Sequence, residues 1–531
     1  MVLIQDVTYV HPNGDVLFAD LNLTINKQDK IALIGNNGSG KSTLLKIISG
    51  DLRPSAGFVR SGSEPYYIPQ LFGQFNGYSV ARALRIEDKL AALTEILNGQ
   101  VTEANMAVLD DDWGIEEKCR EAFAHWRLAD LDLFQKMETL SGGQKTKVFL
   151  AGILIHQPEI VLLDEPSNHL DMPARKILYE YLQSTTNTVL VVSHDRTLLN
   201  LSNTVCELSK RGITVYGGNF EFYSEQKKTE SDALNQDLKS KEKALRKAKE
   251  VERESIERQQ KLDARGKQKQ EKAGLPTISM NTFRNNAEKS TSRMKGVHAE
   301  KVGSIAQELS NLRSELPDTD KMKMDFDHSS LHRGKILITA EHIQFGYEDR
   351  PLWAKPLDFQ IISGERIALK GANGSGKSTL IRMVLGDLQP QTGSLKSADF
   401  RAIYIDQDYS LINNDLTVYE QAKLFNSRRL QEHEIKIRLN RFLFSKFSWD
   451  KPCQALSGGE KMRLMLCMLT IHHQAPDMIV LDEPTNNLDI QNIEILTEAI
   501  NAYKGTLLVV SHDAYFLEQI GIEKVIELQG T

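Results

Sequence analysis

The sequence predicts an α/β protein in which two similar domains are joined by a long antiparallel α-helical hairpin. Three observations lead to this prediction: an internal duplication, short apolar runs that alternate with helical patterns, and a charged central stretch almost free of proline and glycine. The chain has 531 residues, which is too long for one ordinary hydrophobic core, and its apolar content of 40% is enough for two ordinary domains.

The duplication covers four motifs that occur twice in the same order. The segment IALIGNNGSGKSTLLKIISGDLRPSAG at 31–57 recurs as IALKGANGSGKSTLIRMVLGDLQPQTG at 367–393. Three shorter motifs follow in each copy, LSGGQK or LSGGEK, IVLLDEPSNHLD or IVLDEPTNNLD, and LVVSHD. We therefore predict a first domain at 1–223, a linker at 224–334 and a second domain at 335–531.

Each copy alone predicts an α/β fold. Runs such as KIALI and TVLVVSHD are almost uniformly apolar, as expected for strands covered on both faces of a parallel sheet, and helical patterns alternate with them. The spacing from Gln70 to Leu140 is 70 positions, whereas that from Gln407 to Leu456 is 49. The first copy therefore carries about 21 extra residues, which we place near 100–120.

Composition and charge exclude several classes of protein. Four scattered cysteines without a CxxC pair argue against a zinc site or a disulfide framework, and favour a reducing, cytoplasmic compartment. No apolar run approaches the roughly 18 residues that a membrane span needs. The net charge of −6 argues against a general nucleic-acid binder, but residues 258–301 hold 11 Lys and Arg against 4 Asp and Glu.

Two glycine-rich segments, GNNGSGKST and GANGSGKST, match the phosphate-loop pattern G-x-x-x-x-G-K-[ST]. Each follows an apolar run and precedes a helical pattern, so that backbone N–H groups and a helix N-terminus can surround phosphate oxygens. We expect Lys41 and Lys377 to bridge the terminal phosphates of ATP and Ser42 and Ser378 to hold Mg²⁺. The predicted ATP-binding loop residues are Gly35, Asn36, Asn37, Gly38, Ser39, Gly40, Lys41, Ser42 and Thr43, and Gly371, Ala372, Asn373, Gly374, Ser375, Gly376, Lys377, Ser378 and Thr379.

An acidic pair ends a predicted strand in each copy. The aspartates Asp164 and Asp482 are suited to the Mg²⁺ shell, and the glutamates Glu165 and Glu483 are suited to orient and deprotonate an attacking water. A histidine lies 29 positions after each glutamate. This repeated spacing favours a role at the terminal phosphate for the two histidines, His194 and His512.

The LSGGQ and LSGGE segments favour a second anion-binding turn in each copy. Serine at a helix N-terminus presents a hydroxyl and backbone N–H groups to phosphate. The residues concerned are Ser141, Gly142 and Gly143 in the first copy and Ser457, Gly458 and Gly459 in the second.

Taken together, these motifs resemble those of the ATP-binding cassette superfamily over almost all of both copies. The resemblance implies that the two cassettes pair head to tail within one monomer, with each of two ATP molecules between the phosphate loop of one cassette and the signature of the other. It also implies that Gln70 and Gln407 sense Mg²⁺ and the terminal phosphate. The adenine-stacking aromatic falls at Tyr347, with His11 at the matching place of the first copy. Both copies otherwise retain all of the catalytic motif residues, which argues against one of the two ATP sites being inactive.

Two complete cassettes without a membrane domain, joined by a long charged linker, resemble the ABC-F family of translation-associated ATPases. The segment VYGGNFEFYSEQKKTE also resembles the segment that leads into the linker helix in members of that family. This implies an Mg²⁺-dependent ATP hydrolase that docks on the ribosome and is released by hydrolysis. Two alternatives from other classes are the ATPase subunit of a transporter and a DNA-repair ATPase.

The linker pattern predicts two helices that pack on each other. Leucines at heptad-like spacing, such as Leu234 and Leu238, lie on the outgoing segment, and Leu309 and Leu312 lie on the return. We place the tip at 274–285. By resemblance, it approaches the ribosomal exit site, ribosomal RNA and transfer RNA near the peptidyl-transferase region. The predicted contact residues are Leu275, Pro276, Ile278, Met280, Phe283 and Arg284.

The short insertion of the first copy bears on the subtype. Many housekeeping members of the family carry a larger arm there, whereas this one is short and acidic, with Asp110, Asp111 and Asp112. A short arm with a long linker favours antibiotic-resistance ribosome protection, with a housekeeping translation factor as the alternative.

Overall fold

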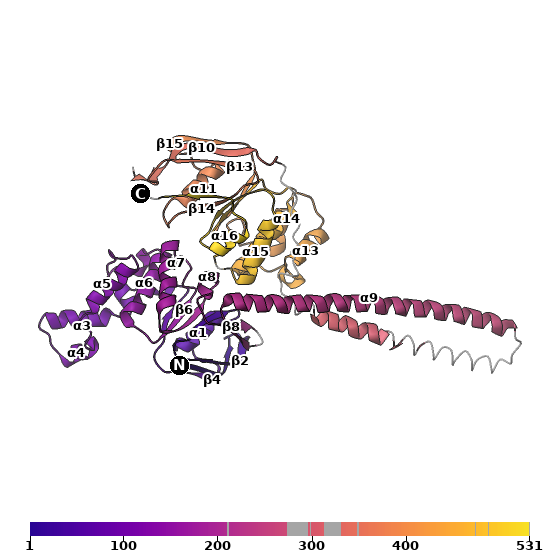
Figure 1. The fold of residues 1–531 in the computed structure, drawn as a ribbon, viewed down its shortest axis with the longest axis horizontal. Helices are drawn as coiled ribbons and strands as arrows, with labels where there is room; N and C mark the ends of the chain where they lie inside the picture. Colours follow the sequence, from indigo (N-terminus) through magenta and orange to yellow (C-terminus); the bar gives the residue numbers. More distant parts are fainter. Residues whose placement is uncertain are drawn as a thin grey trace. The chain divides into compact units, whose positions relative to one another are not determined.

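The structure is a computed structural model of the chain. It describes residues 1–209, 212–272, 292, 296–297, 299–312, 331–347, 350–472, 474–486 and 488–529. The chain divides into two compact units. One holds both copies of the duplicated sequence, Met1–Tyr223 with Met322–Thr531, and the other holds Ser224–Lys321. Figure 1 labels the elements of both units.

The first copy is built on a six-stranded sheet that is parallel except at one edge. In spatial order its strands are β5 (Tyr66–Ile68), β6 (Ile160–Asp164), β7 (Thr188–Val192), β3 (Lys30–Ile34), β8 (Thr204–Ser209) and β9 (Gly212–Gly217). The edge strand β9 runs antiparallel to β8. Strands β6 and β7 are buried along their whole length, as predicted for strands covered on both faces.

A smaller antiparallel sheet covers one side of this core. Its strand order is β2 (Val16–Ile25), β1 (Val2–Val10) and β4 (Ala56–Ser61). The helix α1 (Lys41–Ser49) packs with both sheets in one hydrophobic cluster, to which Ile4, Leu33 and Leu44 belong. The phosphate loop therefore leads into a helix that is held between two sheets.

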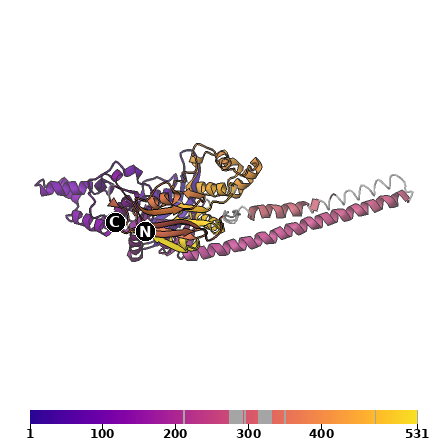
Figure 2. The same ribbon diagram turned by 90° about the horizontal axis from the view of Figure 1, so that it is seen from above.

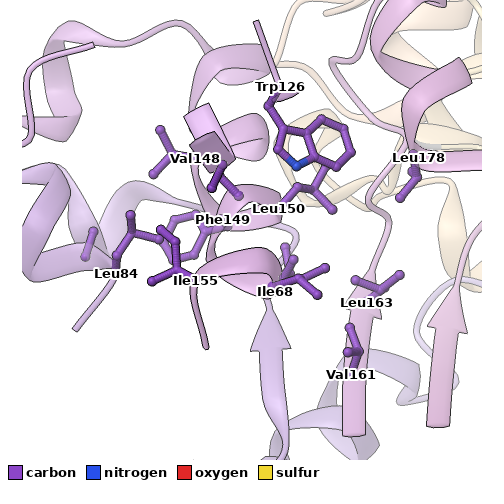
Figure 3. Close-up of a cluster of buried hydrophobic side chains, with 14 of the residues drawn as sticks. Ile68, Leu84, Trp126, Val148, Phe149, Leu150, Ile155, Val161, Leu163 and Leu178 are labelled. Carbon is purple, nitrogen blue, oxygen red and sulfur yellow. The ribbon is translucent and has the colours of Figure 1, made fainter. Parts of the chain in front are cut away.

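Helices of the first copy form a second hydrophobic cluster with the large sheet. They are α2 (Val80–Ala83), α3 (Glu87–Leu97), α4 (Glu103–Leu109), α5 (Ile115–His125), α6 (Gly142–His156), α7 (Met172–Ser184) and α8 (Arg196–Leu199). Figure 3 shows side chains from this cluster, with Phe149 and Leu150 of α6 near Ile68 of β5 and Leu163 of β6. Since α6 begins at the LSGGQ motif and β6 ends at the acidic pair, one core supports both motifs.

The second copy repeats this plan with a five-stranded parallel sheet. Its strands are, in spatial order, β16 (Ala402–Ile405), β17 (Met478–Asp482), β18 (Thr506–Val510), β14 (Arg366–Lys370) and β19 (Lys524–Glu527). The smaller sheets are β13 (Leu357–Ile362), β10 (Ile336–Gln344) and β15 (Thr392–Ser397), and the pair β11 (Gly346–Tyr347) and β12 (Arg350–Pro351). The helices are α11 (Lys377–Leu385), α12 (Val418–Leu424), α13 (Glu432–Arg441), α14 (Gly458–Ile471), α15 (Ile490–Ala502) and α16 (Ala514–Gln519).

The insertion of the first copy consists of two short helices that pack on each other, α3 and α4. In the second copy α12 is followed directly by α13, which corresponds to α5. The predicted position near 100–120 falls on α4 and the start of α5, and α3 precedes it. In the acidic run, Asp112 forms ion pairs with Lys89 and Lys118 at 3.3 and 2.7 Å. These pairs join the turn before α5 to α3 and to α5 itself.

The linker unit contains one long helix and a return segment. Helix α9 (Phe220–Lys272) has 53 residues, which corresponds to about 80 Å. A helical segment at 299–312 lies along α9 in the two views of Figures 1 and 2. The side chains of Lys241 and Glu308 form an ion pair between them, and Leu309 is buried. The predicted tip at 274–285 lies outside the described residues.

Two further features concern the chain as a whole. Among the described residues, the helices are too short or too polar to serve as membrane spans. The four cysteines, Cys119, Cys206, Cys453 and Cys467, are free and buried. Burial raises the pKa of every one of these thiols.

Candidate ATP sites

The two phosphate loops have the same local geometry. Gly40 and Gly376 cap the N-termini of α1 and α11 with φ of 98° and 88°, a left-handed conformation that glycine adopts readily. The side-chain amines of Lys41 and Lys377 donate to the carbonyl of the first glycine in their loops, at 2.7 and 2.8 Å. Each loop thus curves around its own lysine at the N-terminus of a helix, where an anion is favoured.

An aspartate at the end of a strand lies near each phosphate loop, and Asp164 is buried. Asp164 ends β6 and Asp482 ends β17. The hydroxyl of Tyr67 donates to Asp164 Oδ2 at 3.1 Å, and that of Tyr404 donates to Asp482 Oδ2 at 2.9 Å. Burial raises the pKa of Asp164, while hydrogen bonds from Ser42 and Tyr67 lower it. The structure therefore places the serine of the loop beside the aspartate of β6.

The neighbouring glutamates have a left-handed backbone. Glu165 and Glu483 have φ of 51° and 48°, and their N–H groups donate to the last residues of β7 and β18 at 2.8 Å. Such a conformation costs a non-glycine residue about 1–3 kcal/mol and is typical of functional sites. His194 Nε2 lies 3.2 Å from Glu165 Oε1, and His512 Nε2 lies 3.3 Å from Glu483 Oε1.

Burial dominates the protonation of these pairs. It raises the pKa of Glu165, and it raises the pKa of Glu483 to about 7. It lowers the pKa of His194, and it lowers the pKa of His512 to about 4. Each imidazole is therefore neutral and forms no ion pair with the glutamate, and Glu165 Oε1 and Glu483 Oε1 are buried without a hydrogen-bond partner. A carboxyl group with a pKa near neutral pH is suited to accept a proton from water.

The signature motifs start helices through a capping box. The backbone N–H of Gln144 donates to Ser141 Oγ at 3.3 Å, while Gln144 Oε1 accepts from the N–H of Ser141 at 2.9 Å. Glu460 and Ser457 make the same two bonds at 3.3 and 2.8 Å. The glutamine or glutamate of the motif thus fixes the helix start, with the exposed serine beside it.

One cavity gathers residues of both copies. Its volume is about 410 Å³. Its lining includes Lys41 and Ser42 of the phosphate loop, the acids Asp164 and Glu165, and Ser457 of the signature in the other copy. His11, Gln70 and His194 complete the set of predicted residues that line this cavity. A phosphate loop and acidic pair from one copy therefore share a cavity with the signature of the other.

Comparison with known families agrees with this geometry. The profile described as "ABC transporter" matches residues 18–168 and 354–486, which together are more than half of the chain. The chain belongs to the ABC transporter family. The two matched ranges lie in the two copies, which we call the first and the second cassette from here on, and the linker separates them.

Relatives of similar length support an ABC-F type with tandem cassettes. The chain is 31% identical to "Putative ATP-binding protein YdiF" of Bacillus subtilis, with 98% of this chain and 78% of the relative covered. It is 30% identical to "Probable ATP-binding protein YbiT" of Escherichia coli O157:H7, with 97% and 95% covered. It is 29% identical to "ABC transporter F family member 5" of Arabidopsis thaliana, with 97% and 73% covered.

Solved structures share the fold. A structure of archaeal ribosome recycling factor aABCE1 in complex with ribosomal stalk protein aP1 has a TM-score of 0.61 at 20% identity. The match covers 99% of this chain and 89% of that one. A model of ribosome-bound archaeal Pelota and ABCE1 has a TM-score of 0.58 at 19% identity, with 99% and 76% covered. At these identities the likeness concerns the arrangement of the chain alone.

The residues around Asp164 fit a magnesium ion. Asp164 Oδ1 is buried and has no hydrogen-bond partner in the structure, while its other oxygen is occupied by Tyr67. The hydroxyl of Ser42 lies beside it, and Gln70 lines the same cavity. An orphaned carboxylate oxygen among oxygen donors suits Mg²⁺, which prefers oxygen ligands. Among the described residues, no group of three or more His, Cys, Asp or Glu forms a metal cluster.

Hydrogen bonds join the phosphate loops to the segments after the acidic pairs. The backbone N–H of Asn37 donates to Asp489 Oδ2 of the second cassette at 3.0 Å. In the other direction, Asn373 Nδ2 donates to the carbonyl of His169 in the first cassette at 3.3 Å. Gly143 lies so close to this carbonyl that a Cβ there would be 2.6 Å from it. The signature glycine thus permits the close approach of the segment that crosses to the other cassette.

The remaining predicted residues have fewer contacts that bear on a role at the ATP sites. Tyr347 is 56% exposed, and its hydroxyl lies 3.3 Å from Thr379 Oγ1. His11 lines the first cavity and packs edge-on against Tyr9. Gln407 is exposed. The predicted tip residues Leu275, Pro276, Ile278, Met280, Phe283 and Arg284 lie outside the described residues.

The two tyrosines that hold the aspartates were missed by the sequence analysis. Tyr67 lies three positions before Gln70, and Tyr404 lies three positions before Gln407. The repeated tyrosine is visible when YIPQ of the first copy is compared with YIDQ of the second. An apolar strand containing a tyrosine is nevertheless a common core pattern, so the repeat alone would not have assigned the hydroxyl a partner.

Proposed function

We propose that the chain is a Mg²⁺-dependent ATP hydrolase whose two cassettes close around two ATP molecules, and that it acts on the ribosome through its linker. The observation that carries the ATPase part is the cavity in which Lys41, Glu165 and His194 of the first cassette meet Ser457 of the second. A phosphate chain bound there would contact both cassettes, so binding favours the closed pair.

The residues divide the chemistry between them. The loop amides and Lys41 would bind the phosphates, and Asp164 with Ser42 and Gln70 would hold Mg²⁺, which when bound neutralises charge on the phosphates. Glu165, whose pKa is raised by burial, would accept the proton of the attacking water. His194 would keep the glutamate in place through its Nε2 and face the terminal phosphate. Glu483 and His512 have the same contact in the second site.

The ribosomal part of the proposal rests on the linker and on the kind of relative. Helix α9 is about 80 Å long, and cationic residues dominate its far end and the segment after it, which suits a phosphate backbone. The relatives include an ABC-F member, and the fold is shared with a ribosome recycling factor. We infer that ATP closure permits docking and that hydrolysis permits release.

Exchange of both glutamates tests the proposal. Glu165→Gln with Glu483→Gln should slow ATP hydrolysis about 10²- to 10⁴-fold, because a general base is lost while the loops still bind ATP. This protein should sediment with ribosomes when ATP is present. The matched control is Lys41→Ala with Lys377→Ala, which should neither hydrolyse ATP nor sediment. Equal sedimentation of the two proteins would overturn the ribosomal part, and undiminished hydrolysis by the glutamine variant would overturn the catalytic part.

We propose antibiotic-resistance ribosome protection as the physiological role, with a housekeeping translation role as the alternative. The supporting observation is the short insertion, in which α4 has only seven residues. Expression in a drug-sensitive host should raise the inhibitory concentration of antibiotics that bind the peptidyl-transferase region. A variant without residues 275–283 should keep its ATPase activity and lose this protection. Unchanged inhibitory concentrations for all such drugs would favour the housekeeping role.

A further inference from the structure

Arg175 lies where the two cassettes meet, between the loops that carry the two histidines. It belongs to α7, four residues after Asp171, and it is 7% exposed. Its Nε donates to the carbonyl of Leu170 at 3.1 Å, which fixes the side chain to its own cassette. Its Nη1 lies 3.5 Å from Asp195 Oδ2, beside His194, and also donates to the carbonyl of His512 in the second cassette at 3.5 Å.

A second contact holds Arg175 and its partner in this position. The hydroxyl of Tyr179, one helical turn farther along α7, donates to Asp195 Oδ2 at 2.5 Å. Asp195 also caps α8, because its Oδ1 accepts from the N–H groups of Thr197 and Leu198. The carboxylate that faces Arg175 is therefore held on both oxygens, and the guanidinium has a fixed place between the two cassettes.

The second cassette has no equivalent of this arginine. Asp171 and Asp489 both cap the helix that follows the acidic pair, and each accepts from the N–H three residues on. Four residues after Asp489 stands Ile493, which is buried and apolar. The two cassettes thus differ at the position from which Arg175 reaches the loop of His512.

Arg175 contacts a loop that itself contacts the glutamate of the second site. The carbonyl of His512 accepts from Arg175, and the backbone N–H of His512 donates to Glu483 Oε2 at 3.3 Å. The acids that face Arg175 at this junction are Asp195 and Asp513, one from each cassette.

We propose that Arg175 is a positioning residue for ATP hydrolysis in the second site, the one formed on the loop at 371–379, and that the two ATP sites are unequal for this reason. This inference rests on the proposed ATPase function. The guanidinium holds the loop of His512, and with it the hydrogen bond from the backbone N–H of His512 to Glu483 Oε2, in the geometry of the closed pair. The first site receives no cation from the matching position, because Ile493 stands there in the second cassette.

The test measures each site alone in the full-length chain. Glu165→Gln leaves the second site to hydrolyse ATP, and Glu483→Gln leaves the first. Single-turnover hydrolysis with protein in excess of ATP is measured in both backgrounds, with and without Arg175→Met. We expect Arg175→Met to slow the second site about tenfold, the effect of one lost hydrogen bond to a charged group, and to change the first site less than about twofold. The affinity for ATP should stay within about twofold.

Controls separate positioning from closure and from folding. Arg175→Lys, which keeps the charge, should recover part of the rate of the second site. Arg196→Met removes another buried arginine of the same junction and should affect both sites alike. Hydrolysis at the first site in the Arg175→Met protein shows that it is folded. Equal slowing of both sites, or of neither, would overturn the inference, whereas absence of hydrolysis in the unsubstituted chain would overturn the proposed function itself.

Discussion

At the scale of single residues, the aspartate of each ATP site owes its orientation to a tyrosine. The hydroxyl of Tyr67 takes one oxygen of Asp164 and leaves the other without a partner, and Tyr404 contacts Asp482 in the same way. A carboxylate held through one oxygen presents the second in a fixed direction. The tyrosine is therefore part of the candidate metal site although it has no ligand role of its own.

Removal of these hydroxyls should weaken the response to magnesium. For Tyr67→Phe with Tyr404→Phe we expect the Mg²⁺ concentration for half-maximal ATPase activity to rise about three- to tenfold, because a hydrogen bond to a charged group contributes about 1.5 kcal/mol. A titration of ATPase activity with Mg²⁺ measures this. The matched control is Tyr66→Phe, whose hydroxyl donates to the carbonyl of Phe149 in the core. An equal shift in the control would contradict the assigned role.

At the scale of elements, the signature helix begins with a capping box in both cassettes. The pattern S-x-x-Q or S-x-x-E was visible in the sequence, and the structure assigns its last residue to the helix start rather than to phosphate. Glu460 has an additional contact, since both of its oxygens lie 3.0 Å from Lys451 Nζ. The serine is thus positioned by the capping box, which is formed within the motif itself.

A change at the last position of the motif should be felt in the first turn of α14. Glu460→Ala removes the acceptor for the N–H of Ser457 and should destabilise this turn by about 1 kcal/mol. Hydrogen exchange of the amides at 458–461 should then be about fivefold faster. Glu460→Gln, the residue found in the first cassette, should remain close to the original chain. Fast exchange in the glutamine variant would mean that the ion pair with Lys451, and not the cap, holds the turn.

Local patterns could be predicted from the sequence, and contacts between distant segments could not. The acidic pairs and phosphate loops lie next to strands and helices that their own residues specify, as Asp164 at the end of β6 shows. A difference in spacing gives the length of the insertion but not the helices in it, so α3 at Glu87 was not predicted. Arg175 was missed because its contact with His512 joins residues 337 positions apart.

At the scale of the whole ATPase unit, charged contacts join the two cassettes beside the base of α9. Arg196 Nη2 lies 3.0 Å from Glu494 Oε1 of the second cassette. The same guanidinium lies over the rings of Tyr515 and Phe220, at 4.3 and 5.6 Å from their centroids. Because Phe220 is the first residue of α9, one side chain contacts the second cassette and the start of the linker helix.

Charge reversal should reveal this contact as a coupled pair. Arg196→Glu should weaken ATP-dependent closure, since a carboxylate at the buried position of Arg196 would then face the carboxylate of Glu494. Glu494→Arg should do the same, and the double exchange should restore part of the loss. Energy transfer between dyes on the two cassettes measures closure as a function of ATP. Additive effects of the two reversals would show that the residues act independently.

The buried cysteines make such experiments simple to carry out. Each cassette contains two thiols, Cys119 and Cys206 in the first and Cys453 and Cys467 in the second, all with raised pKa values. A thiol reacts with maleimide as the thiolate, so these four react slowly in the folded chain, and a cysteine introduced at the surface takes the dye first. Once the added cysteine is blocked, the rate at which each native cysteine is labelled reports how often the cassette that contains it opens.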